Sequence, residues 1–525
     1  MDVAAGSPFR VWAPQAGRVD LLLAGERRPM RAAAGGWWQS GAAAAPGADY
    51  GFVLDGGEPL PDPRSRWQPD GVHGLSRVVD HAGFRWSDAG WSGLRLADAV
   101  FYELHMGTFT PQGTFDAAVA RLDHLVRLGV GAVEIMPVAE FSGVRGWGYD
   151  GVDLWAPHHA YGGPDGLKRL VDACHRRGLA VVLDVVYNHL GPEGNYLARF
   201  GPYFSDRHHT PWGSAVNFHG ADSRPVRDFV IENAIAWLRD YHLDGLRLDA
   251  VHAVVDSSPG HILAELAARV HGLRWPRFVV AEKPTLDAGL LALGVDGQWA
   301  DGFHHSLHAL LTGERDGYYA LYGRVGDLAE ALRMPWTLGI DPARVVGFAQ
   351  NHDQVGNRAL GERLSQLVEP GRLRLAAALL ACSPLVPLLF MGEEWGASTP
   401  FLFFSDHRDP AVARATSRGR LREFRAFGWR PEDVPDPQDP ASFERSRLDW
   451  DEPGRDAHHG LLAWHRRLLG LRRETPELHA GAPARVEVDE GARTLVMTRG
   501  PVRLCCDFRR GKVIVEKHGR RLDGE

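Results

Sequence analysis

The chain has little cysteine and no segment suited to a membrane. Only four of its 525 residues are cysteine, and none of them is in CxxC spacing: Cys174, Cys382, Cys505 and Cys506. That pattern excludes a zinc-ribbon arrangement and a disulfide framework, and the adjacent pair is predicted to be reduced. No stretch of about 18 apolar residues occurs, so no membrane-spanning helix is predicted.

Long runs of like charge are also absent. The formal net charge is −7, and no block of five or six acidic or basic residues occurs. This excludes a basic nucleic-acid arm and an acidic tail. The start, "MDVAAGSPFRVWAPQ", lacks a basic region followed by an apolar run and is not typical of a secretory signal. We therefore expect a cytoplasmic protein that binds neither nucleic acid nor membrane.

What is present divides the chain into three parts. Residues 1–92 hold short strand-like runs between Gly, Ala and Pro clusters, which indicates a small all-β module. Residues 93–475 alternate apolar strand candidates with helical patterns. Residues 476–525 return to short strands and predict a small C-terminal β domain. The length suits one large domain with smaller attachments.

The middle part predicts a (β/α)8 TIM barrel, an α/β fold. "AVFYELH" is followed by a helix with apolar residues at helical spacing from Phe115 to Val126, and Thr114 is its expected N-cap. Eight strands are expected at 99–105, 132–138, 180–186, 245–251, 278–283, 297–303, 344–351 and 386–394. A doubly wound sheet is the alternative, but about eight repeats favour a closed barrel.

Polar side chains gather where these strands end. The groups at the predicted strand ends are Asp184, Asn188, His189, Arg247, Asp249, Glu282, His352 and Asp353. Catalytic groups of such barrels lie at the C-terminal ends of the strands. A ring of buried ion pairs that only stabilises the fold is the alternative. It is the weaker reading, because buried pairs are often near neutral in net stability.

The residue types indicate glycoside chemistry. Arg247 and Asp249 are two apart in one strand and share a face, so the guanidinium is expected to keep Asp249 ionised, as a nucleophile requires. Glu282 ends an apolar strand, which predicts a raised pKa and the role of general acid. Two such carboxylates are the pair that glycosidases use. A metal centre is the alternative, but a cation and Arg247 would repel each other. No cofactor or metal is predicted.

The segments "DVVYNH", "GLRLDAVH", "VVAEK" and "FAQNHDQ", in this order, resemble the four signature regions of the alpha-amylase superfamily of glycoside hydrolases. The resemblance implies a retaining mechanism through a covalent glycosyl-enzyme intermediate. It implies that Asp249 is the nucleophile, Glu282 the general acid/base and Asp353 the transition-state stabiliser. The remaining expected substrate contacts are Tyr149, Asp184, His189, Arg247, His252, His352, Gln354 and Asn357. Trp147, Trp212, Trp395 and Phe401 are candidates for stacking on sugar, with packing of loop against barrel as the alternative.

More segments narrow the resemblance to the malto-oligosyltrehalose trehalohydrolases. They include "DPRSRWQPDGVHG", "FYELHMGTFTPQGTFDAA", "GWGYDGV", "PYFSDRHHTPWGSAVNF" and "MGEEWGASTPFLFFSDH". The resemblance implies an N-terminal β-sandwich like a carbohydrate-binding module. It also implies cleavage of the α-1,4 bond next to a terminal trehalose, after a partner synthase has built that terminus. A glycogen branching or debranching enzyme is one alternative, and an inactive glucan-binding scaffold is another. One departure is Lys283 directly after Glu282, where acidic and Asn-rich residues are expected.

Overall fold

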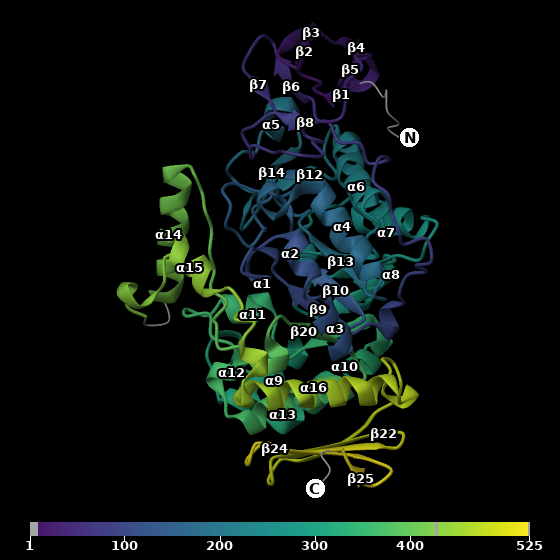
Figure 1. Cartoon of the computed structure of the whole chain (residues 1–525), viewed down its shortest axis with the longest axis vertical. Helices are drawn as coiled ribbons and strands as arrows, with labels where there is room; N and C mark the ends of the chain where they lie inside the picture. The colour runs from purple at the N-terminus through teal and green to yellow at the C-terminus, as the bar shows by residue number, and fades with distance from the viewer. Residues whose placement is uncertain (1–8, 426–428, 523–525) are drawn as a thin grey trace.

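A closed barrel of eight parallel strands occupies the centre of the molecule in the computed structural model, which describes residues 9–425 and 429–522 (Figure 1). The strands are β9 Phe101–Leu104, β10 Ala132–Ile135, β13 Ala180–Val185, β16 Gly245–Leu248, β17 Phe278–Ala281, β18 Gly297–Trp299, β19 Val345–Phe348 and β20 Val386–Phe390. Each pairs with the next along the chain, and β20 returns to β9. All eight predicted strands are confirmed, and the doubly wound alternative is excluded.

The predicted strands are too long at their C-terminal ends. The run 245–251 stops as a strand at Leu248, because Ala250 adopts a left-handed backbone with φ of 40° and Val251 begins a 3-10 helix. The run 297–303 stops at Trp299, and α9 (Asp301–Thr312) begins two residues later. Asp249 therefore belongs to a turn and Asp301 to the start of a helix, so neither continues the sheet.

Helices cover the outside of the barrel. They include α2 Phe115–Val119, α3 Leu122–Leu128, α4 Gly163–His175, α6 Ser223–Asp240, α7 Ile262–His271, α9, α10 Val325–Thr337 and α13 Pro370–Cys382 (Figure 1). Thr114 caps α2 as predicted, since its side chain accepts a hydrogen bond from the Ala117 N–H. The single helix expected after it is instead two, because the chain tightens at Ala120, whose N–H bonds to the Ala117 carbonyl.

Antiparallel sheets lie at the two ends of the molecule in Figure 1. Near the N-terminus, one sheet holds β1 Phe9–Trp12, β5 Trp37–Ser40 and β4 Arg31–Ala33. The other holds β3 Glu26–Pro29, β2 Val19–Leu23, β6 Asp49–Leu54, β7 Pro59–Leu60 and β8 Ser76–Arg77. At the opposite end of Figure 1, five strands form one sheet: β21 Arg485–Asp489, β22 Thr494–Arg499, β23 Val502–Asp507, β24 Lys512–Lys517 and β25 Arg520–Arg521. The predicted sheets are confirmed, while the boundaries at residues 92 and 475 stay predictions.

Two hairpins extend from the C-terminal ends of the barrel strands. The first is β11 Ala139–Glu140 with β12 Asp153–Pro157, and the second is β14 Phe204–Thr210 with β15 Gly213–Val216. Helices α14 (Pro410–Arg425) and α15 (Pro440–Arg445) lie to one side of the barrel (Figure 1). α16 (Asp456–Arg473) leads to the C-terminal sheet.

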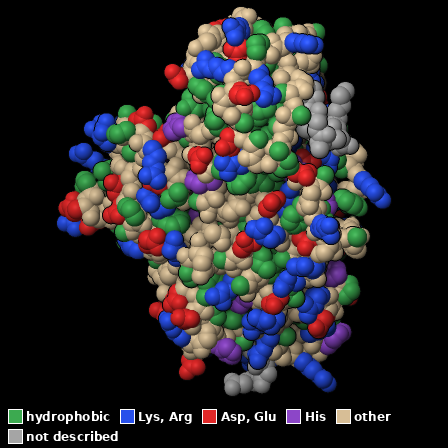
Figure 2. All heavy atoms as spheres, turned by 45° about the horizontal axis from the view of Figure 1, so that its top comes forward, with side chains coloured by type: hydrophobic (Ala, Val, Ile, Leu, Met, Phe, Trp, Pro, Cys, Tyr) green, Lys and Arg blue, Asp and Glu red, His purple; other side chains and the backbone are tan. Residues whose placement is uncertain are grey.

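The cysteines and the surface agree with the sequence reading. All four thiols are free, including those of Cys505 and Cys506 in β23. On the face shown in Figure 2, acidic and basic side chains are interspersed. Among the described residues, no helix is both long and apolar enough to cross a membrane. The cytoplasmic location and the lack of a nucleic-acid partner stay predictions.

Candidate active site

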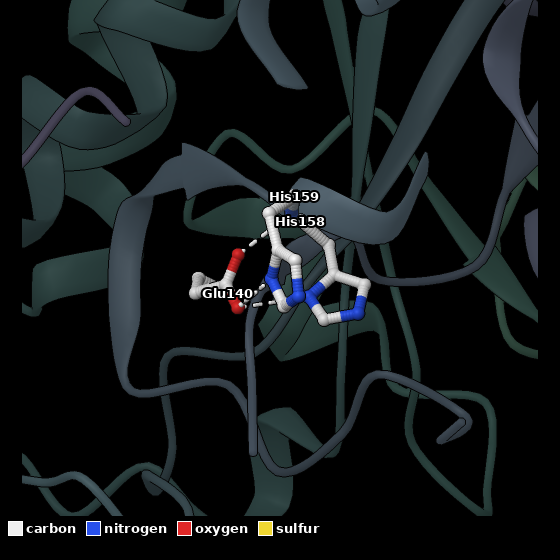
Figure 3. Close-up of side chains that lie close together, drawn as sticks. All are labelled: Glu140, His158 and His159. Atoms are coloured by element: carbon white, nitrogen blue, oxygen red, sulfur yellow. Dashed lines mark hydrogen bonds and ion pairs between the residues drawn. The ribbon is translucent and has the colours of Figure 1, made fainter. Parts of the chain in front are cut away.

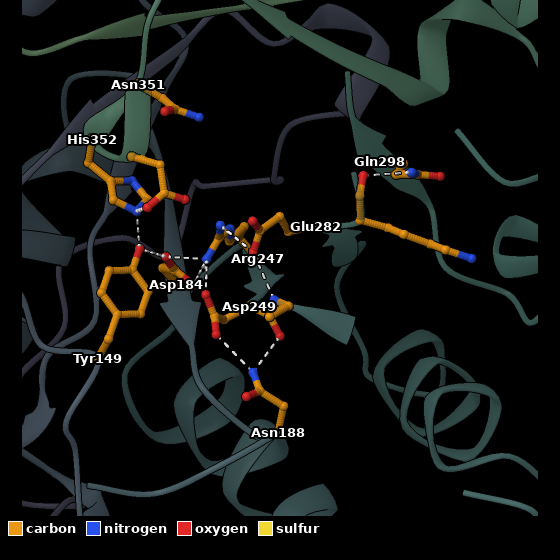
Figure 4. Close-up of polar contacts among 12 residues, drawn as sticks. Tyr149, Asp184, Asn188, Arg247, Asp249, Glu282, Gln298, Asn351 and His352 are labelled. Atoms are coloured by element: carbon orange, nitrogen blue, oxygen red, sulfur yellow. Dashed lines mark hydrogen bonds and ion pairs between the residues drawn. The ribbon is translucent and has the colours of Figure 1, made fainter. Parts of the chain in front are cut away.

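Arg247 is the centre of a cluster of carboxylates at the C-terminal end of the barrel (Figure 4). Its guanidinium is fully buried and lies over the Trp299 ring, 4.3 Å from the ring centre. Nη1 donates to both carboxylate oxygens of Asp184, at 2.9 and 2.7 Å, and to Asp249 Oδ1 at 3.0 Å. Nη2 lies 2.9 Å from Glu282 Oε2. Arg247 and Asp249, the two charged residues of the fourth predicted strand, therefore contact each other. The Arg247 cation contacts three acids, which come from three successive strand ends.

The turn after β16 sets the positions of Asp249 and Glu282. The Asn188 side chain donates to the Asp249 backbone carbonyl at 2.9 Å and to its Oδ2 at 2.8 Å. The left-handed backbone at Ala250 directs its N–H to Glu282 Oε2 at 2.8 Å. A non-glycine residue in that conformation is strained, and such strain persists where surrounding contacts demand it. Glu282 thus lies against Arg247 and a backbone N–H, not in the apolar surroundings predicted from its strand. The role of general acid stays a prediction.

Tyr149 joins the carboxylate cluster to His352. Its hydroxyl donates to Asp184 Oδ2 at 2.6 Å and lies 2.7 Å from His352 Nε2. The Tyr149 and His352 rings are stacked at 5.2 Å between centres. On the other side, Glu103 Oε1 lies 2.5 Å from His352 Nδ1, and Glu103 Oε2 accepts the His352 N–H at 3.0 Å. A continuous polar chain therefore runs from Glu103 through His352 and Tyr149 to Asp184.

Burial and charge act in opposite directions on the pKa values in this chain. Burial alone would lower the pKa of His352, but the Asp353 and Glu103 carboxylates outweigh it and raise that pKa to about 9. Burial raises the pKa of Asp184 to about 7, against the opposing effect of Arg247. His352 is therefore an imidazolium at neutral pH, donating from Nδ1 to Glu103 and from Nε2 to the Tyr149 oxygen.

Asp353, Gln354 and Asn357 lie on or next to the short helix α11 (His352–Gly356), which follows β19. Asp353 Oδ1 accepts from the Asn357 side chain at 3.3 Å and lies 3.5 Å from His352 Nε2. About a third of the Asp353 side chain is exposed. The Asp353 carboxylate is therefore held at the edge of the cluster, and part of its surface is accessible to solvent. The Gln354 side chain forms no hydrogen bond with the described residues that would fix its position.

The other predicted contacts differ in exposure. His189 is buried and stacks on Trp212 at 5.0 Å between ring centres, while Trp212 is 48% exposed. His252 is exposed on the 3-10 helix after β16. Trp147 is buried, stacks on Phe401, and donates its indole N–H to the Leu402 carbonyl at 2.9 Å.

For three of the four stacking candidates, the packing alternative describes what the structure shows. Trp147, Trp395 and Phe401 are 5% exposed or less. Trp147 packs beneath Tyr149 and His352. Lys283, the departure from the expected pattern, pairs with Asp287, the N-cap of α8 (Ala288–Ala292). Its amine is therefore engaged locally.

Sequence reasoning missed several charged residues around the cluster. Glu103 and Glu134 are register partners on β9 and β10 and are both buried. Each is a single acid within an apolar strand, the same signal that drew attention to Arg247. Asp301 begins α9, where burial together with Glu282 and Asp353 raises its pKa to about 8. That position carried no strand-end signal, because the predicted sixth strand ran through it.

The cluster is not built to hold a cation. Arg247 already contacts Asp184, Asp249 and Glu282, and its charge would oppose a metal ion among them. The arrangement suits chemistry in which an ionised carboxylate and a second, proton-transferring carboxyl face one bond.

The chain is similar to known glycoside hydrolases of the alpha-amylase type. Residues 80–212 match the alpha amylase catalytic domain. A malto-oligosyltrehalose trehalohydrolase of Arthrobacter ramosus is 50% identical, and the match covers 97% of this chain and 94% of that protein. A malto-oligosyltrehalose trehalohydrolase of Mycobacterium tuberculosis is 46% identical, and the match covers 95% of this chain and 92% of that protein. The solved structure of an alpha-amylase-related protein from Salmonella typhimurium is 41% identical with a TM-score of 0.88, covering 96% of this chain and 92% of that one. A Corynebacterium jeikeium 1,4-alpha-glucan branching enzyme is more distant, at 29% identity over 75% of this chain and 61% of that protein. The chain therefore belongs to the malto-oligosyltrehalose trehalohydrolase family, within the alpha-amylase group of glycoside hydrolases.

Proposed function

We propose that this protein hydrolyses the α-1,4-glucosidic bond next to the terminal trehalose of a malto-oligosyltrehalose, releasing trehalose and a maltodextrin. The observation that carries the proposal is the buried Arg247, which joins Asp184, Asp249 and Glu282 at one end of the barrel. The high identity to trehalohydrolases over nearly the whole chain supports the choice of substrate.

In the proposed first step, Asp249 attacks the anomeric carbon on the maltodextrin side of the bond. Glu282 gives its proton to the glycosidic oxygen, so that trehalose leaves as a neutral alcohol. The product is a glycosyl ester of Asp249. Asn188 and Arg247, which hold the Asp249 carboxylate, fix its direction of attack.

In the second step, Glu282, now ionised, takes a proton from water. The water attacks the anomeric carbon, the ester bond to Asp249 breaks, and the maltodextrin leaves with its configuration retained. Retaining enzymes place their two carboxyl groups about 5–5.5 Å apart. Two carboxylates held by one guanidinium are compatible with that close spacing.

The surrounding groups have supporting roles in this proposal. Asp353, with its open side, would stabilise the oxocarbenium-like transition state. The Tyr149 ring packs against the edge of Trp147 and stacks on His352. The glucose before the cleaved bond can lie on this Tyr149 ring. Trp212, whose ring is exposed, stacks on the buried His189 beside it. His252, Gln354 and Asn357 are proposed as rim contacts to sugar hydroxyls.

Incubation with maltotriosyltrehalose tests the proposal. We expect stoichiometric trehalose and maltotriose from the wild type, and no turnover from Asp249→Ala. Absence of trehalose with the folded wild type would refute the proposed substrate. Hydrolysis by the wild type would exclude the alternative of an inactive glucan-binding scaffold. Branching of amylose, detected as altered iodine staining, would favour the alternative of a branching enzyme. We also propose that the substrate is supplied by a synthase that converts the end of a maltodextrin to trehalose.

A further inference from the structure

Three side chains that the proposed reaction does not use converge at the base of the β11–β12 hairpin (Figure 3). Glu140 ends β11, His158 directly follows β12, and His159 begins the 3-10 helix His159–Tyr161. One ligand-type atom from each lies within 4.8 Å of the others. The hairpin brings them together because Ala139, next to Glu140, pairs with Pro157, next to His158, at its base.

Both imidazoles point to the same carboxylate oxygen. Glu140 Oε1 lies 2.7 Å from His159 Nδ1 and 3.1 Å from His158 Nδ1. Glu140 Oε2 accepts the backbone N–H of His159 at 2.8 Å, which fixes the carboxylate plane. Two imidazole nitrogens and one carboxylate oxygen therefore lie within 4.8 Å of one another, and the backbone holds the carboxylate in place.

The contact with Glu140 does not satisfy the hydrogen-bonding capacity of the His158 ring. The His158 side chain is fully buried; Nδ1 lies 3.1 Å from Glu140 Oε1 without hydrogen-bond geometry, and Nε2 has no hydrogen-bond partner among the described residues. The ring is stacked on Phe141 at 3.8 Å between centres, so it is fixed with Nδ1 aimed at the Glu140 carboxylate. Buried polar nitrogens are nearly always partnered, and one that is not requires an explanation.

We propose that Glu140, His158 and His159 form a binding site for a divalent transition metal ion of the zinc class. Two imidazoles and one carboxylate are a donor set that Zn²⁺ accepts, with a fourth position left for water. Glu140 and His158 are buried, whereas a quarter of the His159 side chain is exposed, so His159 provides the side from which an ion and its water enter.

The bound ion would act on structure, not in the hydrolysis. It would join the two ends of the segment 140–159, whose middle carries Tyr149 of the candidate active site. A cross-link at the base reduces the freedom of this segment without touching Arg247 or its carboxylates. The expected consequence is a higher melting temperature with little change in activity, since ligands that bind only the folded state stabilise it.

Titration of the chelator-dialysed full chain with Co²⁺, followed by visible absorption, tests this inference, and Zn²⁺ competition reports the zinc affinity. We expect one tightly bound equivalent in the wild type. Since losing even an indirect partner of a metal site weakens binding by about 10–100-fold, His159→Gln should weaken it at least that much. His271→Gln is the matched control, because His271 lies in an exposed pair with Asp296 alone and its loss should leave Co²⁺ binding unchanged.

A second measurement guards against misfolding. Zn²⁺ should raise the melting temperature of the wild type and of His271→Gln, but not that of His159→Gln or Glu140→Gln, while His159→Gln keeps its metal-free melting transition. If the wild type binds no Co²⁺ tightly, or if the two site variants bind it as well as the control, the three residues are only an ion-paired cluster and the inference is wrong.

Discussion

The Glu103–His352 pair allows a quantitative test of how the carboxylate cluster is held together. Both side chains are 1% exposed, and Glu103 accepts hydrogen bonds from the ring and from the backbone of His352. Glu103→Gln removes one negative charge beside the imidazolium while preserving side-chain size and an acceptor oxygen. We expect the variant to fold and to lose stability in a pH-dependent way.

The magnitude follows from the pKa of His352. Its rise from 6.5 to about 9 corresponds to about 3 kcal/mol, since one pKa unit is about 1.4 kcal/mol. Because the folded-state pKa lies above the unfolded value, this stabilisation is complete below pH 6.5 and is lost as pH rises through about 9. Glu103 shares the effect with Asp353, so Glu103→Gln should cost about 1.5–3 kcal/mol at pH 6, the range for a hydrogen bond to a charged group.

Thermal melting of wild type and Glu103→Gln at several pH values between 6 and 9.5 is the assay. We expect a lower melting temperature for the variant at pH 6 and a difference that narrows toward pH 9.5. Glu26→Gln is the control, because Glu26 forms an exposed pair with Arg28 and such pairs contribute little. A melting difference that stays constant across the pH range would refute the assignment of a charged His352.

Four further outcomes are expected. Glu282→Gln should retain the fold but lose about 10²–10⁴ in kcat, measured on maltotriosyltrehalose, as a general acid does. Trp212→Ala should raise KM with little change in melting temperature, because the exposed Trp212 ring is open to a sugar face and, among the described residues, stacks on His189. Gly148→Ala should destabilise the segment before Tyr149, because Gly148 has φ of +97° and an added Cβ would lie 2.0 Å from the Pro137 carbonyl oxygen. Thr114→Ala should cost about 1 kcal/mol of stability through loss of the α2 cap, with kcat unchanged.

These four expectations separate catalysis from structure. Wild-type turnover by Glu282→Gln would remove Glu282 from the acid role. An unchanged KM for Trp212→Ala would leave that ring without a substrate contact. A Gly148→Ala variant as stable as wild type would show that the turn tolerates a different backbone path, and a change in kcat for Thr114→Ala would contradict its purely structural assignment.

The barrel and the position of its charged residues could be predicted from the sequence because both depend on local pattern. An apolar strand ending in a charge was visible at Asp184, Arg247 and Glu282 without knowledge of contacts. Glu103 and Glu134 are also single charged residues in apolar strands. They were missed because they lie within the predicted strands, and only charges at the strand ends were considered. Strand ends were placed one to four residues late; in the fourth strand, for example, alternation continues through "LDAV" although the backbone turns at Ala250.

The amino-acid sequence by itself determined the order of the eight β/α units, the flanking sheets and the family, since hydrophobic periodicity and motif spacing are properties of the chain alone. Only the tertiary structure decided which partners each charge has. It decided that Arg247 holds three acids at once, that Trp147 is packed beneath Tyr149, and that Glu140, His158 and His159 meet. Those facts depend on distances between segments far apart in the chain, which the closing of the barrel and the pairing of its hairpins impose.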